Sequence, residues 1–277
     1  MPQITIFFCK VTYKPQLTMY QILDEYNKNL RESINPDLTT TRYGKIWRFS
    51  QPKLFNSKFF VGKLGYTSAG IEKKTYYDEK AKDFIEKSVD SKLVSYSRWA
   101  IDLSRHLIAF EVKPPDIRYT AFVNAFKSIL DQSPSIGMTI EHMVQSSEFY
   151  EWVERVDKVT KFTANLRAPN PDYQSRTNII KELLELPKGD SAKVEIRISE
   201  EAKESLDTST TISDLVQYGE EGYSTVKAQG LKNGHITQFD SRHKTPSDSV
   251  DIPPTTLPDK IWDYIIDKLK DFKREKD

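Results

Sequence analysis

The stretch from residue 42 to residue 74 carries eight lysine and arginine residues against a single acid, Glu72, with seven aromatic residues among them. Basic side chains on one surface neutralise phosphate groups and release counterions without reading the base sequence. Aromatic side chains beside them can stack on unpaired bases. The sequence therefore predicts a surface that binds DNA without sequence specificity. Its phosphate contacts are predicted to be Arg42, Lys45, Arg48, Lys53, Lys58 and Lys63, with Tyr43 and Trp47 as stacking groups.

A second interpretation of this stretch needs no ligand. Two strands, predicted over 42–49 and 59–67, would place the aromatic residues on the buried face of a hairpin and the lysines on its wet face. Basic hairpins without a partner are common on protein surfaces. Both interpretations stay open on the sequence alone.

Two carboxylates and a lysine in the middle of the chain suggest a different chemistry. Asp102 closes one predicted strand, and Glu111 and Lys113 lie two residues apart on the next. The arrangement resembles the PD-(D/E)xK nuclease motif, in which two carboxylates hold Mg²⁺ and the lysine orients the attacking water. Ile101 precedes the first carboxylate, where that motif usually has proline. The same residue types are also typical of a strand end that faces solvent, so a metal-dependent nuclease is the alternative function.

The composition bounds the remaining possibilities. The 277 residues hold 41 basic and 40 acidic side chains, which argues against binding polyanions over the whole surface and leaves a local patch open. The lone Cys9 excludes an internal disulfide and fits a reducing compartment. The chain has no signal-like start and no apolar run of membrane length, so a cytoplasmic protein is expected. It has no glycine-rich phosphate loop and no Cys/His metal spacing, so no cofactor is expected.

The elements that must position these residues are clearest between Leu93 and Leu130. Residues 93–102 and 107–113 predict two strands joined by the four-residue turn LSRH, and the apolar run at 107–110 is typical of a strand buried on both faces. Two prolines then end the strand, and a helix with one apolar face follows. The charged stretch 73–92 before this hairpin predicts a short helix or a surface insertion.

The whole chain predicts an α+β fold of two domains, each a mainly antiparallel sheet covered by helices. The domains are expected at 1–157 and 158–240, because residues 1–150 carry 21 basic and 16 acidic side chains, whereas the remaining 127 residues carry 20 and 24. Residues 241–258, rich in Ser, Thr, Pro and Asp, predict a linker. An amphipathic helix at 259–277 is expected to dock on its own domain, and the alternative is a surface for a partner or a second copy.

One short motif supports a family resemblance. A predicted strand ends in an R-x-P-N-P-D stretch, which on physical grounds is a strand exit and a helix N-cap. The stretch comprises Arg167, Pro169, Asn170, Pro171 and Asp172. With the order of elements and the terminal helix, it resembles the RexA-like phage-exclusion proteins and an uncharacterised bacterial family found among anti-phage defence genes.

The resemblance implies a homodimer that binds DNA without sequence specificity and signals to an effector or membrane partner. It carries over no catalytic residues. The leading interpretation is therefore a non-enzymatic DNA-binding protein of the anti-phage defence type. A protein-interaction subunit of a defence complex, working through the Trp262 helix, is a further alternative.

Overall fold

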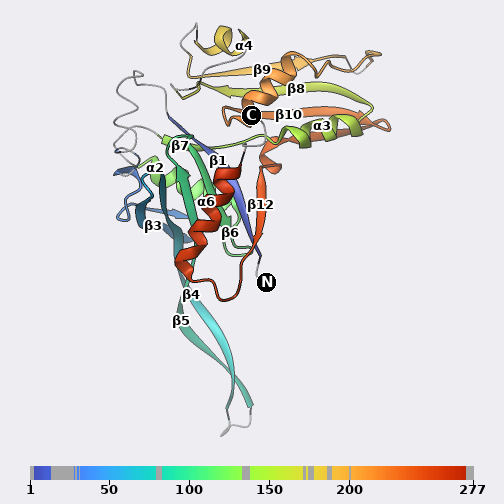
Figure 1. The fold of residues 1–277 in the computed structure, drawn as a ribbon. Coiled ribbons are helices and arrows are strands. Elements are labelled where there is room, and N and C mark those ends of the chain that lie inside the picture. The colour runs from blue at the N-terminus through green and yellow to red at the C-terminus, as the bar shows by residue number, and fades with distance from the viewer. Residues whose placement is uncertain are drawn as a thin grey trace.

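Two antiparallel sheets, of eight and four strands, form the framework of the protein, and helices pack on both of them (Figure 1). The computed structural model describes residues 3–13, 28, 30, 32–78, 83–132, 138–170, 173, 178–185, 189–199 and 201–272. The predicted α+β fold class is confirmed, because each sheet is antiparallel throughout and carries helices on at least one face.

The first sheet is built around the predicted central hairpin. Its strand order is β12 (Ser247–Asp251), β1 (Gln3–Tyr13), β6 (Leu107–Val112), β5 (Asp83–Asp102), β4 (Phe59–Asp78), β3 (Lys45–Phe55) and β2 (Thr39–Arg42), and β7 (Met138–His142) pairs with the other half of β1. Every residue of β6 is buried, because helices cover both faces of the sheet at this point. The central hairpin therefore contributes side chains to two cores, one on each face of the sheet.

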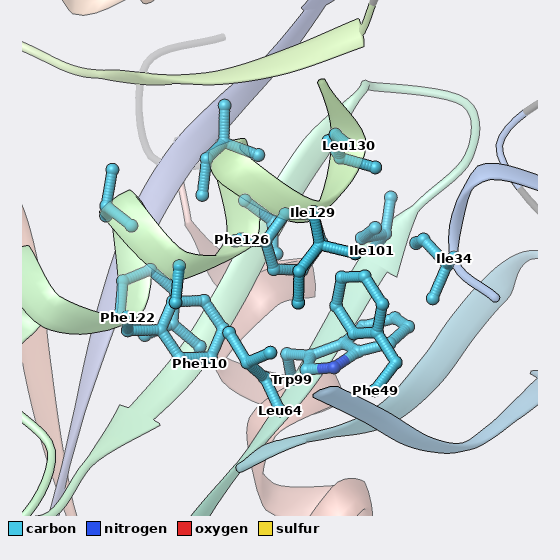
Figure 2. Close-up of a cluster of buried hydrophobic side chains, with 14 of the residues drawn as sticks. Ile34, Phe49, Leu64, Trp99, Ile101, Phe110, Phe122, Phe126, Ile129 and Leu130 are labelled. Atoms are coloured by element: carbon cyan, nitrogen blue, oxygen red, sulfur yellow. The ribbon is translucent and has the colours of Figure 1, made fainter. Parts of the chain in front are cut away.

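The larger core lies between the sheet and helix α2 (Tyr119–Leu130), as Figure 2 shows. Apolar residues recur every three or four positions along α2, so that they share one face of the helix. The ring of Phe110 stacks on Phe122 with centroids 3.9 Å apart, and Trp99 meets Phe126 edge to face at 5.9 Å. Alternate residues of β5 and β6 supply these rings, as the period of two requires.

Helix α6 (Ile261–Asp271) covers the opposite face of the first sheet (Figure 1). Trp262 is only 2% exposed, and its indole N–H donates to the carbonyl of Gly62 at 3.3 Å. A Cβ at Gly62 would approach the ring of Trp99 to 2.5 Å, so the strand needs glycine where it passes between the two tryptophans. The terminal helix thus docks within its own chain, on the first sheet and not on the neighbouring domain predicted at 158–240. The apolar face proposed for a partner is buried within the chain.

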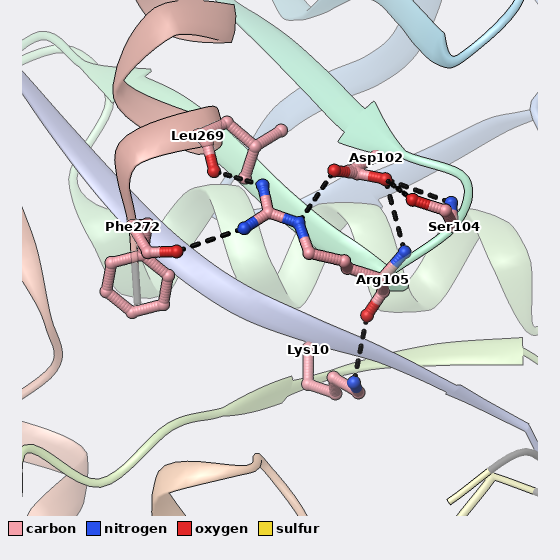
Figure 3. A network of polar contacts seen from close by, with 6 residues as sticks. All are labelled: Lys10, Asp102, Ser104, Arg105, Leu269 and Phe272. Carbon is pink, nitrogen blue, oxygen red and sulfur yellow. Dashed lines mark hydrogen bonds and ion pairs between the residues drawn. The ribbon is translucent and has the colours of Figure 1, made fainter. Parts of the chain in front are cut away.

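The turn between β5 and β6 anchors the end of α6 through Arg105 (Figure 3). The Arg105 guanidinium donates to the carbonyls of Leu269 and Phe272 and pairs with Asp102 at 2.8 Å. Lys10 donates to the Arg105 carbonyl at 2.9 Å. A cation at the carboxyl end of a helix satisfies open carbonyls and opposes the negative end of the helix dipole. One turn therefore closes the hairpin and holds the helix.

Residues 241–258 do not form the predicted linker. They begin with a short 3₁₀ turn (Ser241–His243) and then form β12, which pairs with β1 from Gln3↔Asp251 to Phe7↔Ser247. The prediction was wrong here because an edge strand is held by backbone hydrogen bonds and needs few apolar side chains. The β12 side chains are indeed mostly exposed. A second 3₁₀ turn (Pro258–Lys260) then leads into α6.

Strands β4 and β5 continue well beyond the sheet as a two-stranded ribbon (Figure 1). Their pairing runs without a break from Phe59↔Asp102 to Asp78↔Asp83. The sequence predicted a short helix or surface insertion over 73–92, and the structure instead extends the hairpin. Backbone pairing propagates from the sheet into this charged stretch, which carries no strong apolar pattern of its own.

The second sheet has helices on one face. Its strand order is β11 (His235–Asp240), β10 (Ser224–Lys232), β8 (Lys158–Arg167) and β9 (Ser191–Arg197), with α3 (Ser146–Arg155) and α5 (Thr211–Glu220) packed on it and the short α4 (Asn178–Ile180) running into a π-turn (Lys181–Glu185). The buried rings of Phe149, Phe162 and Phe239 meet in its core, within 6.0 Å of Phe149. None of the helices in the described ranges is long and apolar enough to cross a membrane.

The R-x-P-N-P-D stretch joins the two sheets. Asn170 is 1% exposed and donates through its side-chain amide to the carbonyl of Val11 at 3.1 Å, with His106 Nδ1 at 3.3 Å. Arg167 ends β8 and pairs with Glu141 of β7 at 2.6 Å. The predicted strand exit is thus present, whereas Pro171 and Asp172 lie outside the described residues. The motif links β8 to the hairpin turn and to β1.

Replacing Arg105 with alanine is expected to lower the free energy of unfolding by about 2 kcal/mol, because charge-assisted hydrogen bonds to two helix carbonyls are lost. Hydrogen exchange in residues 261–272 should accelerate more than exchange in α2. The matched control is Arg155→Ala, whose exposed pair with Glu151 contributes about 0.5 kcal/mol or less. Unchanged exchange in α6 of the Arg105 variant would show that this contact does not hold the helix.

Candidate nucleic-acid interface

Three of the predicted phosphate contacts lie on the face of the first sheet that carries α6. Strand pairing sets Arg48 beside Gly65, and sets Lys63 opposite Arg98. Lys53 follows a bulge in β3 that separates it from Ser50, and it pairs with Val61. Directly paired residues of antiparallel strands point to the same face. Arg48, Lys53 and Lys63 therefore belong to one surface.

This surface gathers two further cations around Tyr96. The charged groups of Lys63, Arg98 and Lys113 lie 4.8, 5.2 and 4.2 Å from the centre of the Tyr96 ring. The Lys53 amine lies 5.0 Å from the ring of Trp262, at the start of α6. Cations are attracted to the faces of aromatic rings by the ring quadrupole. We call the group Arg48, Lys53, Lys63, Arg98 and Lys113 the Tyr96 surface.

Glu111 lies beneath these cations and is 1% exposed. Its carboxylate accepts from the Arg98 backbone N–H at 2.8 Å, from the Arg98 guanidinium at 3.1 Å and from Lys113 at 3.2 Å. Arg98 is itself 5% exposed, and its Nε has no hydrogen-bond partner among the described residues. Among the side chains that the structure describes, Glu111 pairs with two of the five cations, Arg98 and Lys113, and the Tyr96 surface therefore carries more basic than acidic groups.

The other predicted contacts lie elsewhere. Arg42, Tyr43 and Lys45 lie at the β2–β3 turn, where Asn124 of α2 donates to the Tyr43 hydroxyl at 3.0 Å and the Lys45 amine lies 3.7 Å from the ring centre of Tyr66. Lys58 belongs to the β3–β4 turn, at the opposite end of β3. The eight residues of the predicted interface therefore do not converge. Only the three on the α6 side form a cluster.

Trp47 cannot serve as a stacking group. It is 0% exposed and packs in the α2 core, with its ring 5.1 Å from that of Tyr66. The sequence interpretation was wrong at this position because Trp47 alternates with Arg48 and therefore points to the other face of the strand. Contact with a base would require opening of the core.

The parts of the nuclease motif do not form a metal site. Asp102 pairs with Leu107, whereas Glu111 lies opposite Arg98, four positions along the strand and so about 13 Å away. Ligands of Mg²⁺ lie about 2 Å from the ion, so the two carboxylates cannot share one. Within the described ranges no three His, Cys, Asp or Glu side chains come close enough to hold a metal ion. Lys113 contacts Glu111 and belongs to the Tyr96 surface.

Asp102 instead has a structural partner. Burial acts to raise its pKa, but hydrogen bonds from Ser104 and Arg105 and the charge of Arg105 outweigh this effect and hold the pKa below its ordinary value. Cys9 also has a structural place, in the core beneath α2. It is 0% exposed, and burial raises the pKa of its thiol to about 12, which keeps it protonated at neutral pH.

Arg98 and Lys113 were not among the predicted contacts, although the sequence held a signal for them. A four-residue turn between Asp102 and Leu107 fixes the hairpin register, and counting back along both strands sets Arg98 opposite Glu111. Lys113, two residues beyond Glu111, then points to the same face. Counting basic residues along the sequence missed Arg98 and Lys113, because such a count does not consider which face of the sheet each residue occupies.

Comparison with known protein families gives one match, a domain of unknown function (DUF4747) over residues 17–263. The chain belongs to the DUF4747 family. The matched region contains the whole Tyr96 surface and every strand except β1. The interface therefore lies inside the unit that defines the family. No curated protein matches the chain.

Substituting Glu111 with glutamine is expected to lower the free energy of unfolding by about 3 kcal/mol, because Arg98 is left buried without a counter-charge. The measurement is urea unfolding followed by tryptophan fluorescence. Glu151→Gln, which changes an exposed helical pair, serves as the control and should change stability by about 0.5 kcal/mol at most. Equal stability of the two variants would refute the buried pair.

Asp102→Asn is expected to reduce stability at neutral pH and to remove one part of the acid sensitivity of the protein. A carboxyl whose pKa is lowered by folding contributes stability above its ordinary pKa, and this contribution is lost as the pH falls through the lower, folded value. The difference in unfolding free energy between wild type and variant should therefore be constant from about pH 5 to about pH 7, because this range lies above the ordinary pKa of aspartate. The difference should shrink below about pH 3.8. A difference that does not vary with pH would contradict the assignment.

Proposed function

We propose that the protein binds DNA without sequence specificity through the Tyr96 surface. The observation that carries the proposal is the gathering of five cations on one face of the first sheet, of which Arg98 and Lys113 pair with the buried carboxylate of Glu111. The chain as a whole has a formal net charge of +1, so this surplus reflects placement and not composition. Arg48 and Lys53 are exposed, and Lys63 and Lys113 are half-buried, so their amines and guanidinium can reach a phosphate.

The form of the surface favours phosphate contacts over base contacts. The cations project from a sheet face beside α6, and no recognition helix presents them. Lysine binds phosphate as a flexible point charge and reads no base pattern by itself. The exposed apolar residues next to them, Ile46 and Val94, would pack against sugar groups. Such contacts give affinity that depends on salt and little sequence preference.

The wider biological role rests on the resemblance drawn from the sequence. Likeness to the RexA-like phage-exclusion proteins supports a place in bacterial anti-phage defence, with a homodimer as the working form. Gel filtration with light scattering tests this part separately, because a monomeric mass at micromolar concentration would remove the homodimer. A nuclease has less support, since Asp102 and Glu111 do not share a site.

The Tyr96 surface is tested by removing three of its charges together. The triple variant Arg48→Gln, Lys53→Gln, Lys63→Gln should bind a DNA duplex at least about tenfold more weakly than wild type. The slope of log affinity against log salt should become less steep by about 3, because each lost phosphate contact lowers the slope by about 0.9. Fluorescence anisotropy at several salt concentrations measures both quantities.

The matched control is the triple variant Arg42→Gln, Lys45→Gln, Lys58→Gln. It removes the same charge from residues that the sequence predicted for the interface and that the structure places away from the Tyr96 surface. Its affinity and salt slope should stay close to those of wild type. Equal losses in both variants would mean that net charge, and not this surface, governs binding.

A further inference from the structure

The second sheet has a polar face opposite the one that carries α3 and α5. Along β8, β9 and β10 the apolar residues alternate with polar ones, so every second side chain points away from the core. Five basic residues point to this outer face, and a sixth, Arg242, lies beside it through its contact with Asp240. The five are Lys161, Arg167, Lys193, Arg197 and Lys227.

Too few carboxylates accompany these cations. Lys161 and Lys193 lie 3.3 and 3.6 Å from Glu195, which also pairs with Arg197. Asp240 accepts from Lys227 at 3.2 Å and from Arg242. Five of the six cations therefore share two carboxylates of the second sheet. Arg167 contacts Glu141 of the first sheet, which Lys127 contacts as well.

The spacing of the cations suits an extended polyanion. Residues 161 to 167 of β8 span about 20 Å, a length over which a DNA duplex presents about a dozen phosphates. Asn165 and Thr225, which are not buried, lie between the basic residues and can donate hydrogen bonds to phosphate oxygens. The cations are one-third to two-thirds exposed, so a ligand can reach them.

One end of this face opens into a cavity of about 660 Å³ between the two sheets. Arg167, Lys193 and Asn165 line it from the second sheet, and His142 of β7 lines it from the first. The pKa of His142 is lowered to about 4, first by burial and then by the positive charges of Lys127 and Arg242. The carboxylates of Glu141 and Asp190 line the cavity as well, so the basic residues at this end have acidic neighbours.

We propose that this outer face, the second-sheet face, is a second phosphate-binding surface, so that one molecule can hold two DNA duplexes at once. The inference rests on the proposed function for the other duplex, which the Tyr96 surface would hold. The two surfaces lie on different sheets and share no residue. Their separation allows each to contact a duplex of its own.

The test compares binding with bridging. A biotinylated duplex on beads captures a fluorescent duplex only when the protein holds both. The triple variant Lys161→Gln, Arg197→Gln, Lys227→Gln should still bind a single duplex through the Tyr96 surface, whereas its capture of the second duplex should fall at least tenfold. The conservative variant Lys161→Arg, Arg197→Lys, Lys227→Arg should capture as wild type does, which separates loss of charge from loss of fold.

The outcomes separate the two proposals. If light scattering shows a monomer, capture by the triple glutamine variant equal to that of wild type overturns the second-sheet face. A homodimer could bridge through two Tyr96 surfaces, so for a dimer the deciding quantity is the number of duplexes bound per protomer, which should fall from two to one in the variant; an unchanged number overturns the second-sheet face. Wild-type binding by the Arg48, Lys53, Lys63 variant overturns the Tyr96 surface alone. If the Arg48, Lys53, Lys63 variant still binds one duplex weakly, adding glutamine at 161, 197 and 227 should abolish this residual binding. Residual binding that survives all six substitutions contradicts the second-sheet face.

Discussion

Arg98 and Glu111 face each other across β5 and β6, and the first sheet forms only in a register that buries them together. Trp99, which follows Arg98, and Phe110, which precedes Glu111, pair with each other and point into the α2 core. A slip of one residue in either strand would turn a charge into that core and a ring toward α6. An unpaired buried charge costs several kcal/mol, which is comparable to the stability of a whole domain. The ion pair therefore selects the register, whatever its own net contribution to stability.

The same register places the turn that holds the terminal helix. Because Asp102 pairs with Leu107, Arg105 emerges between them and reaches the last carbonyls of α6 (Figure 3). Docked in this way, Trp262 brings an aromatic ring beside Lys53 and Lys63 at the edge of the Tyr96 surface. The shape of the Tyr96 surface thus depends on α6, which lies more than 150 residues after Arg105 in the sequence. The basic residues of the surface, in contrast, belong to the segment from β3 to the end of β6.

The sequence was sufficient for the parts of the fold in which local pattern and tertiary packing agree. The hairpin over 93–113, the apolar face of α2 and the docked terminal helix all follow from periodicity and turn length. Strand β12 and the long ribbon of β4 and β5 could not be predicted in this way, since backbone pairing with a neighbour holds them and their own side chains do not. Three of the six predicted phosphate contacts form a cluster, and Trp47 was misassigned because linear counting ignores the alternation of faces.

The counts of acidic and basic residues in the sequence also did not indicate where the cations lie in the structure. The half of the chain after residue 150 is net acidic, with 24 acids against 20 bases, yet it holds all six cations of the second-sheet face. Strand alternation places five of these cations on the outer face of β8, β9 and β10 together with Glu195 and Asp240, whereas other acids of this half, such as Asp214 and Glu220, belong to α5 on the covered face. Because helices cover only one side of this sheet, basic residues dispersed along a nearly neutral sequence come together on its open face. Net charge therefore says little about nucleic-acid binding in this protein, and the faces on which the charges lie are what matters.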